Sequence, residues 1–169
     1  KGSSYPDANG SVGILFEQAS SRGSAQQTDN GLLSFPYSIR NQVLTSLSTM
    51  QALAALRVEL NTYLRDFYKT ALDEARQSDA RAYVFGNAQT RLQDREFLQI
   101  LLRHRIQVYP LAETARVGEQ VFEKNAAWLV PVEQPGYRLV QGIFERRTSF
   151  PDSIFYDISA WTLPDAFGL

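Results

Sequence analysis

The most regular hydrophobic pattern of the chain runs from Ser38 to about Arg76, where apolar residues recur every three or four positions. This spacing predicts a long amphipathic helix, or two helices with a bend between them, and it is interrupted only at the step past Arg57. Ser38 is the expected N-cap, because its hydroxyl can accept from a free amide of the first turn. An unbroken helix of this length would span about 60 Å and is therefore expected to bridge two modules.

Short apolar runs and a second helical pattern follow. Residues 82–85 predict a strand that is closed by Gly86, and residues 106–109 predict another strand. Between them, Thr90 is placed to cap a helix over residues 91–104. A strand, a helix and a strand in this order form a βαβ unit, which implies two parallel strands joined by a right-handed crossover.

The rest of the C-terminal half continues this alternation. We expect a short strand at residues 121–122, a longer one over 127–132, a helix over 137–144 that Pro135 introduces, and a short helix within 152–167. Together these elements predict a small α/β domain of three layers with a parallel sheet.

The N-terminal region has a different pattern. Residues 12–16 are almost wholly apolar and follow the turn-rich residues 1–10, so they predict a buried strand. Glu17 ends this strand, and residues 18–36 are expected to form an unusually long loop. A carboxylate at the end of a buried strand is a common position for an active-site group. A solvated strand-end glutamate is the alternative, and position alone favours it.

Composition narrows the possible functions. The chain has 44% hydrophobic and 21% charged residues and a net charge of −1, without a dense basic cluster, so nucleic-acid binding is not expected. It has no run of apolar residues long enough to predict a membrane span. The absence of cysteine excludes disulfides, thiolate metal sites and cysteine nucleophiles. Because the chain opens with Lys1 and not methionine, we expect it to be a segment of a longer protein.

Several candidate groups have ordinary structural explanations. His104, the single histidine, is expected to end a helix, where a cation complements the helix dipole. Gly86 alone does not make the G-x-G-x-x-G spacing of a nucleotide-binding loop. Four aromatic residues could line a cleft, although core packing is their commoner role: Trp128, Phe155, Tyr156 and Trp161. Asp157 and Asp165 are expected to be buried or capping groups, and Arg146 and Arg147 to be solvated.

Two stretches carry a family resemblance. Residues 13–23 (GILFEQASSRG) and 35–42 (FPYSIRNQ) resemble the end of the catalytic domain in a divergent bacterial branch of the zinc carboxypeptidases, the carboxypeptidase A-like metallopeptidases. In that family a strand ending in Phe-Glu delivers a glutamate to the zinc-bound water. The resemblance implies that Glu17 is the general base, which takes a proton from the attacking water and passes it to the leaving amine. A tyrosine near the glutamate is another family feature, and Tyr5 is the candidate for it.

Later segments resemble the accessory region that follows the peptidase in these proteins, a class I glutamine amidotransferase-like domain of flavodoxin type. They are residues 82–86, 106–111 and 156–164. The resemblance thus divides the chain into a peptidase remnant at 1–36, a linker helix at 37–77 and an amidotransferase-like domain at 78–169. An amidotransferase needs a cysteine nucleophile, so this domain is expected to be non-catalytic.

The family's zinc ligands, a His-x-x-Glu pair and a distant histidine, are not in this chain. Zinc, the peptide substrate and the upstream peptidase domain are therefore expected only in the parent protein, which the resemblance places in the periplasm or outside the cell. Alone, the chain is expected to be inert. One alternative is a binding or scaffolding module for a cell-wall peptide or glycan. Another is a flavodoxin-like redox protein, which would need a phosphate-binding loop that the sequence does not show.

Overall fold

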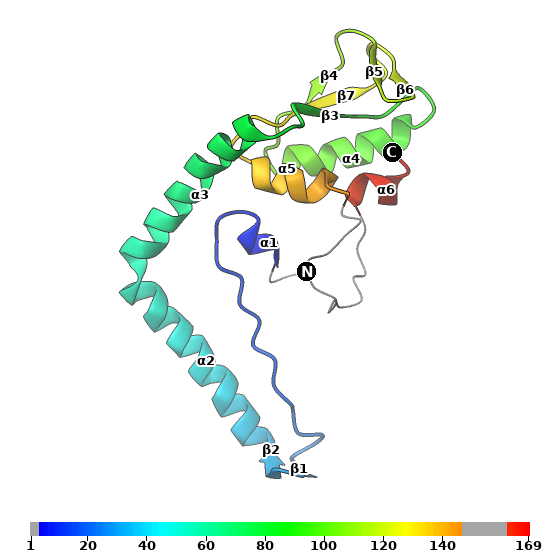
Figure 1. Cartoon of the computed structure of the whole chain (residues 1–169). Helices are drawn as coiled ribbons and strands as arrows, with labels where there is room; N and C mark the ends of the chain where they lie inside the picture. Colours follow the sequence, from blue (N-terminus) through cyan, green and yellow to red (C-terminus); the bar gives the residue numbers. More distant parts are fainter. Residues whose placement is uncertain (1–3, 147–161) are drawn as a thin grey trace. The chain divides into compact units, whose positions relative to one another are not determined.

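The structure is a computed structural model that describes residues 4–146 and 162–169. The chain forms two compact units, Lys1–Asp66 and Phe67–Leu169, which we call the N-terminal and C-terminal units and describe separately (Figure 1). Several residues discussed above lie outside the described residues: Arg147, Phe155, Tyr156, Asp157 and Trp161.

The N-terminal unit consists of a short helix, an irregular segment, a β-hairpin, a long helix and the first half of another helix. Its elements are α1 (Ser4–Asp7), β1 (Ala25–Thr28), β2 (Gly31–Ser34), α2 (Phe35–Ala55) and the first half of α3 (Arg57–Gln77). The long loop expected over residues 18–36 is wrong, because β1 and β2 pair there as an antiparallel hairpin. Asp29 and Asn30 make its two-residue turn, and Gly31 follows with a φ of 107°, a conformation that glycine adopts without strain. These strands lack alternating apolar residues, so hydrophobic periodicity did not reveal them.

The predicted helical region is two helices. α2 begins earlier than expected, and its N-cap is Ser34, whose Oγ accepts from the amide of Tyr37, so the assignment of Ser38 as the cap is wrong. Pro36 lies in the first turn of α2. Amides in the first turn have no acceptor within the helix, so the amide hydrogen that proline lacks costs no hydrogen bond there. The chain leaves the helix at Leu56, next to the interruption of the hydrophobic spacing at Arg57, and α3 then continues to Gln77.

The buried strand expected at residues 12–16 is also wrong for this chain. These residues belong to no strand, and Val12, Ile14, Leu15 and Phe16 are between 46% and 65% exposed. A strand needs a neighbour to accept its backbone hydrogen bonds, and among the described residues none pairs with this segment. Within the described part of the N-terminal unit, these apolar side chains therefore stay about half exposed.

The C-terminal unit combines helices with two antiparallel sheets. After the second half of α3, its elements are β3 (Ala82–Phe85), α4 (Arg91–Arg103), β4 (Tyr109–Pro110), β5 (Ala115–Val117), β6 (Gln120–Phe122), β7 (Trp128–Pro131), α5 (Tyr137–Phe144) and α6 (Leu163–Phe167). The main sheet has the order β3-β7-β4, and β5 pairs with β6 as a hairpin. The positions of β3, α4, β7 and α5 confirm those predictions, whereas β4 shares only Tyr109 with the strand expected at residues 106–109.

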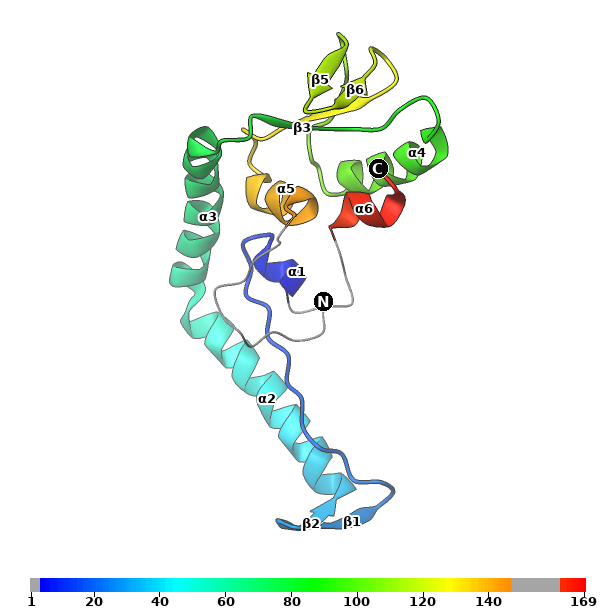
Figure 2. The ribbon, with the colours of Figure 1, turned by 45° about the vertical axis from the view of Figure 1, so that its right-hand side comes forward.

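The general α/β class is therefore confirmed, but the parallel, flavodoxin-like sheet is not what the structure shows. β7 pairs antiparallel with both β3 and β4, so it separates the two strands of the predicted βαβ unit. Both views show α4, α5 and α6 on the same side of the main sheet, which makes two layers of the described elements (Figures 1 and 2). Local patterns located β3 and β7 correctly, but strand order depends on which distant segment returns to pair.

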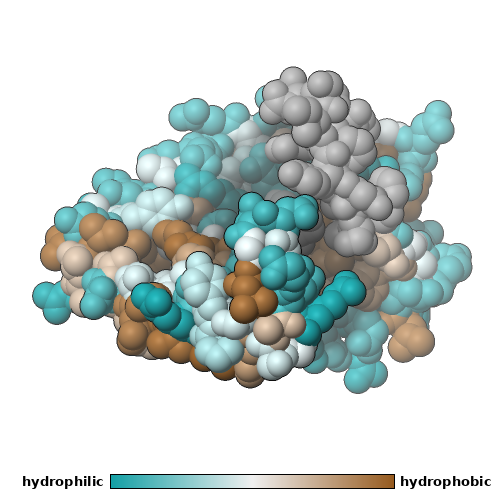
Figure 3. Space-filling view, turned by 90° about the horizontal axis from the view of Figure 1, so that it is seen from below, coloured by the Kyte–Doolittle hydropathy of each residue, from teal (hydrophilic) through white to brown (hydrophobic). Residues whose placement is uncertain are grey.

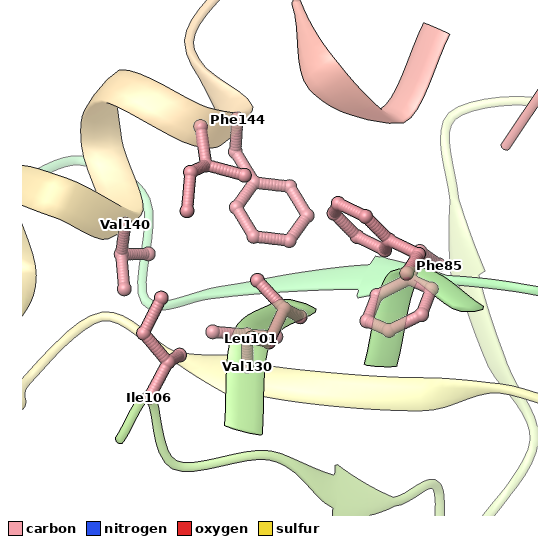
Figure 4. Close-up of a cluster of buried hydrophobic side chains, with 8 residues drawn as sticks. Phe85, Leu101, Ile106, Val130, Val140 and Phe144 are labelled. Atoms are coloured by element: carbon pink, nitrogen blue, oxygen red, sulfur yellow. The ribbon is translucent and has the colours of Figure 1, made fainter. Parts of the chain in front are cut away.

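The core of the C-terminal unit lies between this sheet and its helices. Side chains from β3, α4, β7 and α5 point toward one another there (Figure 4), and the buried set is Phe85, Phe97, Leu101, Ile106, Val130, Val140, Ile143 and Phe144. The Phe85 and Phe97 rings meet edge to face at 4.8 Å. A second buried cluster joins Ala71 and Ala75 of α3 to Val132 and Tyr137. The second half of α3 is therefore an integral part of this unit.

Candidate functional site

Glu17 lies in the irregular segment of the N-terminal unit, directly before a residue that is anchored to α2. Gln18 Nε2 donates to the carbonyl oxygen of Ser38 at 2.8 Å, in the first turns of the helix. Farther along, the amide of Phe35 donates to the Ser24 carbonyl at 3.0 Å. The loop after Glu17 is thus fixed at both ends, while the Glu17 side chain itself is exposed.

Near Glu17 lie exposed apolar side chains and one buried hydroxyl that no described residue pairs with. Apolar side chains precede Glu17 on the exposed segment. In the view from below, brown hydrophobic residues lie open at the surface of the molecule (Figure 3). The hydroxyl of Ser38 is buried and, among the described residues, has no hydrogen-bond partner. Buried polar groups in complete domains are nearly always paired. This part of the chain therefore has the properties of an incomplete site.

Tyr5, the other residue suggested by the family resemblance, lies in α1 and is 52% exposed. Its carbonyl accepts from Asn9 Nδ2 at 2.8 Å, which closes the turn after α1. Asp7 of the same helix accepts from the amide of Gly13 at 2.8 Å and so connects α1 to the segment that leads to Glu17. Tyr5 and Glu17 therefore belong to the same unit, on elements that this bond links.

The residues present do not fit a zinc ion. Within the described parts of the chain, no three histidine, cysteine or acidic side chains lie close enough together to hold a metal. His104 is the C-cap residue of α4, and its Nδ1 lies 2.7 Å from the carbonyl oxygen of Ile100. This position agrees with the expectation that His104 ends a helix.

A polar cluster that sequence reasoning missed lies between β3 and α4. Asp94 is only 4% exposed, and its Oδ1 accepts from Thr90 Oγ1 at 2.9 Å. Burial raises the pKa of Asp94, against the opposing effects of the hydrogen bonds from Thr90 and the Asn87 backbone. Gly86 has a φ of 90°, and a Cβ there would lie 2.8 Å from Asp94 Oδ2. Asp94 therefore fixes the shape of the loop, and the spacing of Thr90 and Asp94 by one helical turn was the only sequence signal.

A pocket of about 230 Å³ lies beside this loop. Its polar lining includes Asn87, Gln120, Arg146 and Thr162, and Phe144 contributes an apolar wall. Arg146 is exposed, as expected, and forms an ion pair with Asp165. Of the two roles expected for Asp165, burial is wrong, because its side chain is 41% exposed in that pair, whereas its position in the first turn of α6 is one where an acidic group suits a helix.

Trp128 packs against the core of the C-terminal unit, which agrees with the core interpretation of this aromatic residue.

A buried glutamine was not foreseen. Gln134 is 2% exposed, accepts from the amide of Gln107 at 2.8 Å and donates to the Pro131 carbonyl at 2.6 Å. It holds the chain after α4 against the end of β7.

No protein-family model, no curated protein and no solved structure matches this chain. The resemblance to zinc carboxypeptidases therefore stays a prediction. None of the described helices is both long and apolar enough to span a membrane.

Proposed function

We propose that this chain is part of a zinc carboxypeptidase-like peptide hydrolase, in which Glu17 is the general base and the C-terminal unit is a non-catalytic accessory domain. One observation carries the proposal. No hydrophobic side chain of the described N-terminal unit is buried, although the segment before Glu17 and the helix after it are rich in such residues. A unit of this kind has no core of its own and fits a piece of a larger domain.

The placement of Glu17 suits a base that is completed by another body. The carboxylate is exposed, and the anchored Gln18 restricts the backbone next to it. A general base must lie within hydrogen-bond distance of the proton that it takes, so a fixed backbone position is useful. Substrate binding and zinc binding belong to the upstream peptidase domain in this proposal, because the described residues of this chain bring together no fitting ligand set.

The test is Glu17→Gln in a longer polypeptide that contains this sequence. Peptide hydrolysis should fall by about 100- to 10,000-fold, the range for loss of a general base. Zinc content should stay unchanged, because Glu17 is not a ligand in this proposal. Asp29→Asn, in the turn of the neighbouring hairpin, is the matched control and should leave turnover unchanged. Unchanged turnover of Glu17→Gln would refute the assignment.

The chain by itself should neither hydrolyse peptides nor retain zinc. After incubation with zinc and dialysis, atomic absorption should find much less than one ion per chain. Stoichiometric zinc that survives dialysis would contradict the proposal, because it would require a ligand set within these residues.

The pocket beside the β3–α4 loop favours a second candidate function. In this alternative, the C-terminal unit binds a cell-wall peptide or glycan, for which Asn87, Gln120 and Thr162 offer hydrogen-bonding groups. Calorimetric titration with muropeptides should then give saturable binding that Gln120→Ala weakens. The absence of heat in the titration would exclude this candidate.

A further inference from the structure

β3 lies at the edge of the main sheet, where β7 is its only neighbour among the described strands. Antiparallel neighbours alternate between pairs that exchange hydrogen bonds and pairs that do not. Ala82 faces Pro131, which has no amide hydrogen, so this pair is one that does not exchange them. Two positions farther on, Val84 and Leu129 form a pair of the same kind. The amide and carbonyl of Val84 therefore point away from β7, and no described residue bonds to them.

β3 also lacks the features that protect most edge strands. Natural proteins usually block such an edge with a very short strand, a proline, charged side chains or a bulge. β4, at the opposite edge of the sheet, is two residues long and contains Pro110. β3 has four residues, and none of them is charged or proline. It is therefore the edge of this sheet to which another strand can be added.

The pocket of about 230 Å³ lies beside this edge. Val84 and Phe85 line it from β3, and none of its described lining residues belongs to β7. Further walls come from the β5–β6 hairpin and from the ends of α5 and α6, through Gln120, Phe122, Phe144, Arg146, Thr162 and Pro164. Small-molecule sites usually measure about 300–1,000 Å³, so this pocket suits one side chain of an added strand better than a sugar chain.

The pocket offers hydrogen-bond donors that no described acceptor uses. Asn87 Oδ1 accepts from the amides of Gln89 and Thr90 at 2.8 and 3.2 Å, which leaves the two N–H groups of Nδ2 without an acceptor. Arg146 donates from Nη2 to Asp165 and has further N–H groups besides. It carries the only charged side chain among the described lining residues. Unused donors beside a guanidinium favour a carboxylate as the group that enters.

The size of the edge decides between a peptide and a second copy of the chain. Two four-residue strands that pair edge to edge would bury on the order of a few hundred Å² per chain, whereas a standard interface buries roughly 800 Å² per partner. A second β3 would also bring no carboxylate to the pocket, because none of its residues is charged. An extended peptide binds through main-chain bonds to a sheet edge and through pockets for alternate side chains, which this edge supplies.

We propose that the C-terminal unit binds an extended peptide as a fourth strand on β3, with an acidic side chain of the peptide in the pocket beside Arg146. Bonds to the Val84 backbone hold the peptide, and the pocket selects its sequence. The inference rests on the second candidate function and narrows it, because it selects a peptide over a glycan. It is independent of the catalytic role of Glu17.

Calorimetric titration of the whole chain tests the side-chain contact. The probe is an acetylated seven-residue peptide of alternating threonine and valine with a central glutamate, and a matched probe has glutamine there. The glutamate peptide should bind with a Kd below about 1 mM and about 10-fold more tightly than the glutamine peptide, because it gains a charge-assisted hydrogen bond. Arg146→Gln should remove this difference. Arg95→Gln changes an exposed arginine of α4 and should keep it.

Methylation of the peptide backbone tests the strand pairing without altering the protein. Only alternate amides of an added strand point toward β3. N-methyl groups on one alternate set of amides in the glutamate peptide should therefore weaken binding by about 10-fold or more, and those on the other set should change it by less than about 2-fold.

Four outcomes would overturn the inference. They are no saturable binding of the glutamate peptide at millimolar concentration, equal affinity of the glutamate and glutamine peptides, equal weakening by both methylated sets, and a stable dimer that Val84→Pro dissociates. The dimer would identify a second copy as the occupant, since proline is tolerated at an edge whose amide points outward. Failure of the other proposals is a separate result. Muropeptides that give no heat while this peptide binds would exclude only the cell-wall ligand, and full hydrolysis by Glu17→Gln would remove only the catalytic role.

Discussion

Arg138 connects α5 to α3 through several contacts that the sequence pattern did not predict. Its Nε donates to Glu74 Oε2 at 3.0 Å, Nη1 to the Phe67 carbonyl at 2.7 Å and Nη2 to Thr70 Oγ1 at 2.9 Å. The guanidinium carbon also lies 4.4 Å from the centre of the Phe67 ring. Arg138→Ala should therefore weaken the packing of the second half of α3 against α5.

The expected cost follows from the separate contacts. A partly exposed ion pair contributes about 0.5–1 kcal/mol, a charge-assisted hydrogen bond about 1.5 kcal/mol and the cation–π contact about 0.5–1 kcal/mol. Because contacts of one side chain are not additive, we expect a loss of about 2–3 kcal/mol in the free energy of unfolding. Arg138→Lys keeps the charge but cannot make all the bonds, and should lose about half as much.

Tryptophan fluorescence during urea unfolding is the assay, because Trp128 packs against the core of the C-terminal unit. In thermal unfolding followed by the same fluorescence, the melting temperature should fall by roughly 10–20 °C for Arg138→Ala. Arg95→Ala removes an exposed arginine of α4 and is the control, expected to change the free energy by less than about 0.5 kcal/mol. A loss for Arg138→Ala no larger than for the control would refute the assigned role.

Three further substitutions test the interior of the C-terminal unit. Gly86→Ala should cost about 2 kcal/mol by urea unfolding, because the positive φ and the nearby Asp94 carboxylate both oppose a Cβ; the cost should shrink in an Asp94→Ala background. Burial raises the pKa of Asp94, so the folded state gains a proton before the unfolded chain as pH falls. The charged form of Asp94 therefore opposes folding, and the wild type should gain stability relative to Asp94→Asn as the pH falls from neutral toward the ordinary pKa of aspartate; a constant difference would contradict this. Gln134→Ala should cost about 1–3 kcal/mol, because the Gln107 amide and the Pro131 carbonyl lose the partner that the buried Gln134 side chain gives them; a midpoint equal to that of the wild type would contradict this.

The local sequence pattern was sufficient to predict a helix or strand wherever neighbouring residues decide the conformation. The strands at 82–85 and 127–132 and the helices after Thr90 and Pro135 lie where apolar spacing predicted them, although the Thr90 side chain makes no capping bond and Pro135 lies before the N-cap residue of α5, Gly136. The interruption at Arg57 likewise marks the break between α2 and α3. In each case hydrogen bonds within a few residues, or a short apolar run, carry the information.

For the candidate site, the sequence identified Glu17 and its apolar neighbours but not the Asp94 cluster. Residue type and order were enough to single out a carboxylate at the end of an apolar run. The burial of Asp94 depends on the fold of β3 over α4, which neither segment encodes alone. The catalytic role of Glu17 stays a prediction from family resemblance.

The sequence by itself determined most of the helices and strands, the exclusion of cysteine chemistry and the apolar character of the segment before Glu17. The tertiary structure decided the strand order, because β7 returns from a distant part of the chain to separate β3 from β4. It also decided that residues 12–16 are exposed here, since a strand forms only where another strand accepts its backbone hydrogen bonds. Pairing between distant segments is a property of the whole fold, and local sequence specifies only the surfaces that such pairing can use.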